Sequence, residues 1–154
     1  MPAQARTTDP LVGRRQAVMA LCAEAQRDEL EGALAALPPV GPVEDLRRPE
    51  SGLVMTRGRI GGDGAPFNLG EATVTRAAVR LGDGETGFAY QLGRDAAKAR
   101  ASAILDALMQ RDAAPVEAAL RPVAARLDGE RALAERRTAA TRVNFFTMVR
   151  GEDR

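Results

Sequence analysis

The chain contains 154 residues, with 22 basic and 21 acidic side chains and a formal net charge of +1. This length predicts one domain that buries about two-thirds of its unfolded surface, and the balanced charge provides no global field to attract nucleic acid. The sequence has no histidine, a single cysteine, no Walker loop and no nucleophile elbow, so the usual residues and motifs of an independent catalyst are missing.

The first part of the chain is predicted to be helical. We expect residues 1–8 to be frayed and residues 9–37 to form two helices. Asp9 and Pro10 give the first helix an N-cap acceptor and a proline in its first turn. One face of this helix is formed by residues at helical spacing, namely Leu11, Arg15, Val18, Cys22 and Ala25. A second helix is expected to start near Asp28, with Glu31 completing a capping box, and to end before Pro38.

Cys22 lies on the apolar face of the first predicted helix, so we interpret it as a small core residue rather than a reactive thiol. A lone cysteine forms no internal disulfide, which fits a reducing compartment. The N-terminus lacks a continuous apolar segment, and no window approaches the roughly 20 apolar residues of a membrane span. These features predict a cytoplasmic protein.

Residues 43–93 are predicted to form a four-stranded antiparallel meander. A short edge strand lies within residues 40–48, bracketed by Pro42 and Pro49. A turn at residues 49–52 leads to a second strand at 53–58, and a glycine-rich turn leads to the long strand ending at Leu81. Residues 86–92 pair back as the fourth strand. Short turns favour antiparallel pairing, because parallel strands need long crossovers.

The long strand is predicted to have two different faces, because successive side chains alternate. One face is aliphatic or hydroxylated and includes Thr75, Ala77 and Val79. The opposite face carries Arg76 and Arg80, whose positions lie about 14 Å apart at about 3.4 Å per residue. The sheet therefore has a polar, cationic face.

Residues 94–154 are predicted to be helical with a C-terminal segment, which completes an α+β fold. Asp95 is the expected N-cap of a helix with Ile104, Leu105 and Leu108 on its buried side. Another helix is expected to start at Pro115 and to break at Pro122. Asp128 is expected to cap a last helix that runs to about Ala140, and we interpret its polar surface as solvated.

A set of arginines is the candidate phosphate-binding site, since the guanidinium fork suits phosphate. Its members are Arg57, Arg59, Arg76, Arg80 and Arg94. The alternative is that they form salt bridges with Glu71, Asp83, Glu85 and Asp95, and the residues alone favour this alternative. The GGDG turn at 61–64 can also form an anion nest, although a glycine turn is more often only a turn.

The segment RVNFFTMVRG at residues 142–151 is the candidate interface. It places two of the four phenylalanines side by side near the chain end. An exposed run of this kind would be an aggregation hazard, so it is expected to be buried against its own sheet or in another chain. The interface candidates are Arg142, Phe145, Phe146, Met148 and Val149.

Several of these stretches together carry a family resemblance. They are GRIGGDGAPFNLGEATVTRAAVRL at 58–81, GFAYQLGRD at 87–95, ILDALMQ at 104–110 and RVNFFTMVRG at 142–151. In this order and spacing the chain resembles PhnG, a small subunit of the bacterial carbon–phosphorus lyase system. The closing FFTMVRG is the most specific piece, and the likeness covers nearly all of residues 1–154, as a single PhnG-like domain.

The resemblance implies an accessory subunit without catalytic residues of its own. PhnG-like proteins act in a core complex with PhnI, PhnH and PhnJ, which transfers an alkylphosphonate to the ribose C1 of ATP and releases adenine. ATP and alkylphosphonate are then substrates of the complex, and no cofactor, metal, nucleic acid or membrane is expected for this chain. PhnI, to which the base-displacing activity is attributed, is the expected direct partner. Asn144 departs from the Asp expected in the closing motif, which weakens any essential ion pair or proton transfer there.

Two other classes of function remain open from the residues alone. An independent enzyme is disfavoured by the missing histidine. A small RNA-binding domain would use an arginine-bearing sheet, but such sheets usually display stacking aromatics, and the long strand offers none between residues 69 and 81.

Overall fold

The computed structural model describes residues 10–141, which form an α+β domain. Within this range the elements, in chain order, are α1 (Pro10–Glu24), α2 (Arg27–Ala35), β1 (Val43–Arg59), β2 (Pro66–Leu81), β3 (Thr86–Leu92), α3 (Ala96–Arg111), α4 (Ala113–Ala119) and α5 (Arg121–Ala140). The predicted order, with helices before and after a sheet, is confirmed.

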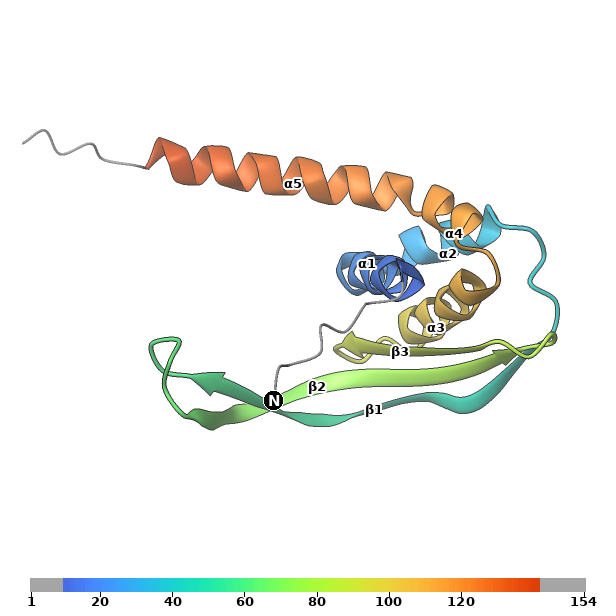
Figure 1. The fold of residues 1–154 in the computed structure, drawn as a ribbon, viewed down its shortest axis with the longest axis horizontal. Coiled ribbons are helices and arrows are strands. Elements are labelled where there is room, and N and C mark those ends of the chain that lie inside the picture. Colours follow the sequence, from blue (N-terminus) through green and yellow to red (C-terminus); the bar gives the residue numbers. More distant parts are fainter. Residues whose placement is uncertain (1–9, 142–154) are drawn as a thin grey trace, which may run out of the picture.

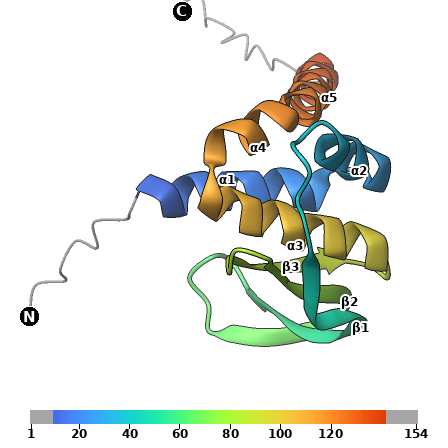
Figure 2. The ribbon, with the colours of Figure 1, turned by 90° about the vertical axis from the view of Figure 1, so that its right-hand side faces the viewer.

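The helices lie in layers on one face of the sheet (Figure 1). The sheet order is β1-β2-β3, with antiparallel pairing between neighbours. Helix α3 packs against all three strands, and α1, α2 and α4 pack against α3. Figure 2 shows α3 between the sheet and the other helices. Among the described elements, none lies on the opposite face of the sheet.

The prediction of four strands is wrong for the described residues, because the first two predicted strands are one. β1 runs without interruption from Val43 to Arg59, and the expected turn at residues 49–52 lies inside it. Irregular register between Asp45 and Arg47, and between Arg47 and Glu50, accommodates Pro49. A proline is tolerated here because β1 is an edge strand, where a missing N–H leaves no ladder partner unsatisfied.

The N-terminal helix boundaries agree with the sequence in part. Helix α1 covers Pro10–Glu24 from the first described residue, and the predicted cap Asp9 and the predicted frayed residues 1–8 lie outside the described residues. Helix α2 begins at Arg27, and the backbone N–H of Gln26 donates to Glu29 Oε2 at 2.8 Å. The expected pairing of Asp28 with Glu31 is therefore displaced by two residues, because Gln26 can cap the same turn.

Of the C-terminal helices, α3 begins where predicted, and α4 and α5 begin earlier. Asp95 is the N-cap of α3, as expected, and accepts a hydrogen bond from the Lys98 N–H at 2.9 Å. Asp112 rather than Pro115 starts α4, by accepting from the Ala114 N–H at 3.1 Å. Pro122 lies in the first turn of α5, where its missing N–H costs no hydrogen bond.

Because α5 already begins at Arg121, Asp128 lies inside this helix and caps nothing, which corrects the predicted helix start. The predicted end near Ala140 is confirmed. Residues 128–140, about three and a half turns, are exposed on all sides, in agreement with a solvated helix.

The core between the sheet and the helices is built from small and aliphatic side chains. The buried side of β2 consists of Thr75, Ala77, Val79 and Leu81, as the alternation predicted. Cys22 is fully buried in the same core, and burial raises the pKa of its thiol to about 12. Cys22 is thus a protonated core residue, which confirms the interpretation from the sequence.

A glycine allows β3 to approach α3 closely. A Cβ atom on Gly87 would lie 1.9 Å from the Ala103 carbonyl oxygen and 2.6 Å from the Ala107 backbone nitrogen. Both groups belong to the backbone of α3, so a flexible side chain cannot move aside to make room. The separation of the helix and the sheet is therefore set by the absence of a side chain at residue 87.

We predict that Gly87→Ala lowers the free energy of unfolding by about 1–3 kcal/mol, because the added methyl group overpacks the interface between α3 and β3. Urea unfolding followed by circular dichroism measures the change. Gly129→Ala is the matched control, since a Cβ at that position in α5 meets nothing within 4 Å. The control is expected to stabilise the protein by up to about 1 kcal/mol through helix propensity. Equal urea midpoints for Gly87→Ala and the parent protein would contradict the close packing.

Candidate functional site

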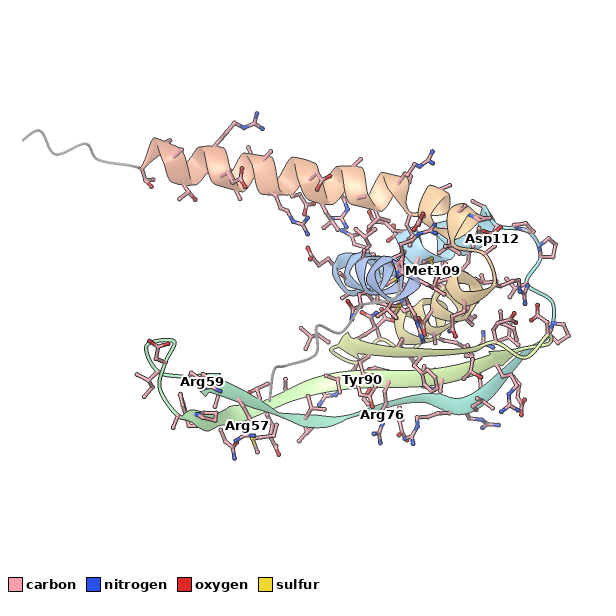
Figure 3. All side chains as sticks on the ribbon, viewed as in Figure 1. Arg57, Arg59, Arg76, Tyr90, Met109 and Asp112 are labelled. Atoms are coloured by element: carbon pink, nitrogen blue, oxygen red, sulfur yellow. The ribbon has the colours of Figure 1, made fainter. Side chains whose placement is uncertain are left out.

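The uncovered face of the sheet carries a row of large side chains from β3. Phe88, Tyr90 and Leu92 alternate with the buried Ala89 and Gln91 along this strand. The three large side chains are 52%, 62% and 79% exposed. We call the sheet face turned away from α3 the outer face. Figure 3 shows Tyr90 and Arg76 beside each other on this part of the sheet.

Arg76 lies in the middle of the outer face between two partners. In the sheet register it is opposite Tyr90 on β3 and Glu50 on β1. Arg76 Nε donates to Glu50 Oε1 at 2.8 Å. The Tyr90 hydroxyl and the Glu50 carboxylate raise the pKa of Arg76 above its ordinary value, because both favour the charged guanidinium.

Arg80 is arranged in the same way, four residues further along the strand. It is opposite Glu44 on β1, and its guanidinium lies 3.6 Å from the Glu44 carboxylate. Both arginines of the long strand therefore lie on the same face of the sheet, as predicted, and both form ion pairs with β1. The salt-bridge alternative describes these two residues, but with different carboxylates from those expected.

The expected carboxylates have other partners. Asp83 and Glu85, in and after the turn between β2 and β3, both pair with Arg111 at the end of α3. Asp95 pairs with Arg27 of α2 at 2.9 Å. Glu71 forms no ion pair with any residue in the range 10–141. The Arg111 pairs join the turn between β2 and β3 to α3, and the Arg27 pair joins the start of α3 to α2.

The other three candidate arginines have no carboxylate partner among the described residues. Arg57 and Arg59 lie in the distal part of β1 (Figure 3), and Arg59 Nη1 donates to the Gly64 carbonyl at 3.2 Å. Arg94 lines a separate shallow hollow with Ser51, Leu53 and Thr73. The five arginines are thus spread over the sheet instead of sharing one pocket, and phosphate binding stays a prediction.

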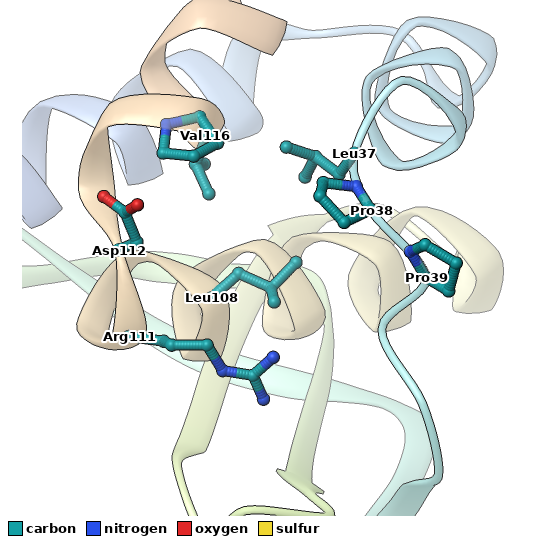
Figure 4. Close-up of a pocket in the computed structure, with 8 residues that line it drawn as sticks. Leu37, Pro38, Pro39, Leu108, Arg111, Asp112 and Val116 are labelled. Carbon is teal, nitrogen blue, oxygen red and sulfur yellow. The ribbon is translucent and has the colours of Figure 1, made fainter.

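A more enclosed hollow lies elsewhere, between the α2–β1 connection, the end of α3 and α4 (Figure 4). It has a volume of about 220 Å³ and is lined by Leu37, Pro38, Pro39, Leu108, Arg111, Asp112, Pro115 and Val116. Its walls are mainly apolar, and the guanidinium of Arg111 is occupied by Asp83 and Glu85. Sequence analysis missed this hollow because its walls come from segments about 70 residues apart.

The groups that an acid–base mechanism would need are not gathered at either place. The Cys22 thiol is buried and protonated. Lys98 Nζ donates to the Ala23 carbonyl at 2.8 Å, and Tyr90 lies on the open outer face. Within residues 10–141, no three His, Cys, Asp or Glu side chains are placed to hold a metal ion.

Sequence reasoning overlooked the aromatic side chains of β3, although the signal was present. In TGFAYQL the large residues stand at every second position, so all three share one face once the strand is recognised. The predicted interface lies outside the described residues, as does the departure at Asn144; its members are Arg142, Phe145, Phe146, Met148 and Val149. In the described part of the chain, we find no helix with the length and hydropathy needed to cross a membrane.

The fold and this surface define a small α+β scaffold whose most distinctive feature is an exposed aromatic and arginine-bearing sheet face. Residues 13–151 match the profile of the family described as phosphonate metabolism protein PhnG. The chain is 54% identical, over 155 aligned residues covering 99% of both chains, to alpha-D-ribose 1-methylphosphonate 5-triphosphate synthase subunit PhnG of Rhizobium meliloti (strain 1021). The chain belongs to the PhnG family, as the motifs in its sequence predicted.

The pairing of Arg76 with Glu50 predicts a measurable pKa change. Arg47 and Arg76 both hold the pKa of Glu50 below its ordinary value. Ionised Glu50 therefore stabilises the fold above its unfolded-state pKa, and this contribution disappears as the pH falls through the lowered folded-state value. We expect Arg76→Gln to move the pKa of Glu50 part of the way back, with Arg47 retaining the rest.

A carboxyl-carbon NMR titration measures this shift. Arg80→Gln is the matched control, because Arg80 pairs with Glu44 instead. An unchanged Glu50 pKa in Arg76→Gln, or an equal shift in both variants, would show that the cross-strand pair does not persist in solution.

Proposed function

We propose that this chain is a non-catalytic, accessory subunit of an alpha-D-ribose 1-methylphosphonate 5-triphosphate synthase. The relative from Rhizobium meliloti bears that enzyme's name, and the near-complete coverage of both chains supports the same role here. The complex transfers an alkylphosphonate to the ribose C1 of ATP with release of adenine, in the breakdown of organic phosphonates. The chain belongs to an enzyme through its partners and is inactive alone.

The observation that carries this proposal is the position of the aromatic side chains. Phe67, Phe88 and Tyr90 are the aromatic residues within 10–141, and they are 40%, 52% and 62% exposed. The buried core of the same region is built from Ala, Val, Leu, Ile, Met and Cys. Large aromatic side chains usually dominate cores and the centres of interfaces. A domain that excludes them from its core and displays them on its sheet is suited to bury them against another protein.

We infer that a PhnI-like subunit is the direct partner, with PhnH-like and PhnJ-like subunits in the same cytoplasmic core complex. Phe88, Tyr90 and Leu92 would form the apolar centre of the contact on the outer face. The pairs Arg76–Glu50 and Arg80–Glu44 would form a charged rim. Near-zero net charge argues against nucleic acid as the partner.

The outer face is tested by truncating its two aromatic side chains. We expect Phe88→Ala combined with Tyr90→Ala to weaken assembly with the PhnI-like subunit at least about tenfold, because interface aromatics are frequent hot spots. Co-expression followed by size-exclusion chromatography with mass detection measures assembly, and adenine release from ATP measures the activity of the complex.

Leu133→Ala is the control, since Leu133 is an exposed apolar residue of α5, 42% exposed and remote from the sheet. If both variants assemble like the parent protein, the outer face is not the interface. If the parent chain runs alone beside its partner, the subunit role itself is wrong. Adenine release by the isolated chain would contradict the accessory role.

The C-terminal segment is a second, separate element of the proposed interface. We expect Phe145→Ala combined with Phe146→Ala to weaken assembly while the circular dichroism and thermal unfolding of the isolated chain stay unchanged, because aromatic anchors bury large areas. Thr147→Ala, between the same neighbours, serves as the control. Normal assembly of the double variant would remove this segment from the interface, and a loss of folding would instead assign it to the chain's own core.

A further inference from the structure

The two halves of β1 differ in how they protect a free sheet edge. β1 is an edge strand, and within residues 10–141 its outer side has no strand partner. Its first half, residues 43–50, contains Pro49, two register irregularities and five charged residues. Prolines, bulges and charges are the features by which natural proteins prevent an edge from pairing with another chain.

The following segment, SGLVMT at residues 51–56, has none of these features. It contains no charge and no proline, and its six residues pair with β2 in continuous register. Leu53, Val54 and Met55 are 60%, 38% and 52% exposed. An uncharged segment of this length with β-forming side chains on an open edge would promote aggregation if it stayed uncovered. We call residues 51–56 the open edge.

Residues 53–56 of the open edge lie on a two-stranded arm of the hairpin, and Ser51 and Gly52 lie where the three-stranded part ends. β3 pairs with β2 only from Val74 to Arg80, so the preceding part of the hairpin is two-stranded. Figure 1 shows this part of β1 and β2 extending past β3, α1 and α3, while α5 runs over the same length at a distance on the helical side. A two-stranded hairpin is marginally stable by itself. The other edge of the arm is formed by β2 and is protected from pairing with another strand, because it contains Pro66, a register shift and Gly70 at φ 152°.

Charge defines one end of the open edge. Arg57 and Arg59 follow it directly, and neither forms an ion pair with a carboxylate among the described residues, Asp63 and Glu71 of the same arm included. At the other end, Glu50 is already paired with Arg47 and Arg76. The surface is therefore apolar along its length and cationic at its distal end.

We propose that the open edge accepts an extended segment of a different subunit of the synthase complex as a fourth strand of the sheet. The segment would place apolar side chains beside Leu53 and Met55, and carboxylates beside Arg57 and Arg59. Backbone hydrogen bonds would provide affinity and the alternating side chains specificity, as in other cases of strand addition. This proposal rests on the subunit role proposed above.

A second copy of this chain fits the open edge less well. Antiparallel pairing of two copies, centred between Leu53 and Val54, would place Arg59 of one copy opposite Arg48 of the other, and Arg57 opposite Glu50, a carboxylate that already pairs with Arg47 and Arg76. Like charges directly opposite each other destabilise a sheet. A parallel arrangement would place Arg57 opposite Arg57. A different subunit with carboxylates at this end avoids both conflicts.

Amide hydrogen exchange, resolved to single residues, tests the proposal on unmodified protein. The isolated chain is compared with the assembled complex. Strand addition is expected to slow every second amide in residues 51–56 at least tenfold on assembly, because those N–H groups gain acceptors. Amides of residues 43–50 are expected to exchange at the same rate in both states.

Each result leads to a different conclusion. A complex that forms without slower exchange at residues 51–56 overturns the strand addition and leaves the subunit role intact. Slower exchange in the isolated chain that increases with its own concentration overturns the choice of partner in favour of a second copy. Failure of any complex to form overturns the subunit role, and this proposal with it.

A pair of charge substitutions provides a second readout. Leu53→Lys places a charge on the open edge and is expected to weaken assembly at least tenfold. Leu46→Lys is the matched control, because Leu46 is a 40% exposed apolar residue in the protected half of the same strand. Equal assembly of the two variants, with thermal unfolding of both isolated chains unchanged, would contradict the proposal.

Discussion

The buried carboxylate of Asp106 joins three elements of the fold. Asp106 lies on α3 and is 1% exposed, and Arg15 of α1 donates to both of its oxygens, at 2.5 and 2.7 Å. The same carboxylate also accepts a hydrogen bond from the backbone N–H of Phe88 in β3, at 2.8 Å. A buried charge that loses its partner typically destabilises a protein by about 3–5 kcal/mol. Helix α1, helix α3 and strand β3 are therefore held in one arrangement.

This arrangement decides where the large side chains can go. Gly87 and the alanines of α3 bring the helix close to β3, so Gly87 and Ala89 fill the inner side of this strand there, and Gln91 is buried further along with its amide donating to Ser102. Phe88, Tyr90 and Leu92 then stand on the outer face by strand alternation. The close helix–sheet packing and the exposed aromatic surface are two consequences of the same geometry. A surface that is fixed by the core in this way is preorganised for a partner, which lowers the entropic cost of binding.

The sequence predicted those features that depend on neighbouring residues. Alternation along the long strand identified the buried side of β2, and Asp95 was recognised as a helix cap because the hydrogen bond closes within three residues. Features that depend on long-range pairing were missed. Pro49 suggested a turn, but pairing with the 16 residues of β2 keeps β1 extended through it. The ion partners of Arg76 and Arg80 depend on the β1–β2 register, which no local pattern defines.

The distribution of ion pairs separates the arginines into two groups that differ in how readily they can bind an anion. An anion that binds Arg76 or Arg80 must displace Glu50 or Glu44, whereas Arg57 and Arg59 have no carboxylate to displace among the described residues. Exposed ion pairs contribute about 0–1 kcal/mol each. The cost of displacing one carboxylate is therefore small, but it favours anion binding at the unpaired arginines. If the carboxylates of a partner strand occupy Arg57 and Arg59, these two arginines cannot also bind phosphate. Arg94, which lies apart from the arm's tip beside the Ser51 and Thr73 hydroxyls, is then the remaining unpaired member of the predicted anion set.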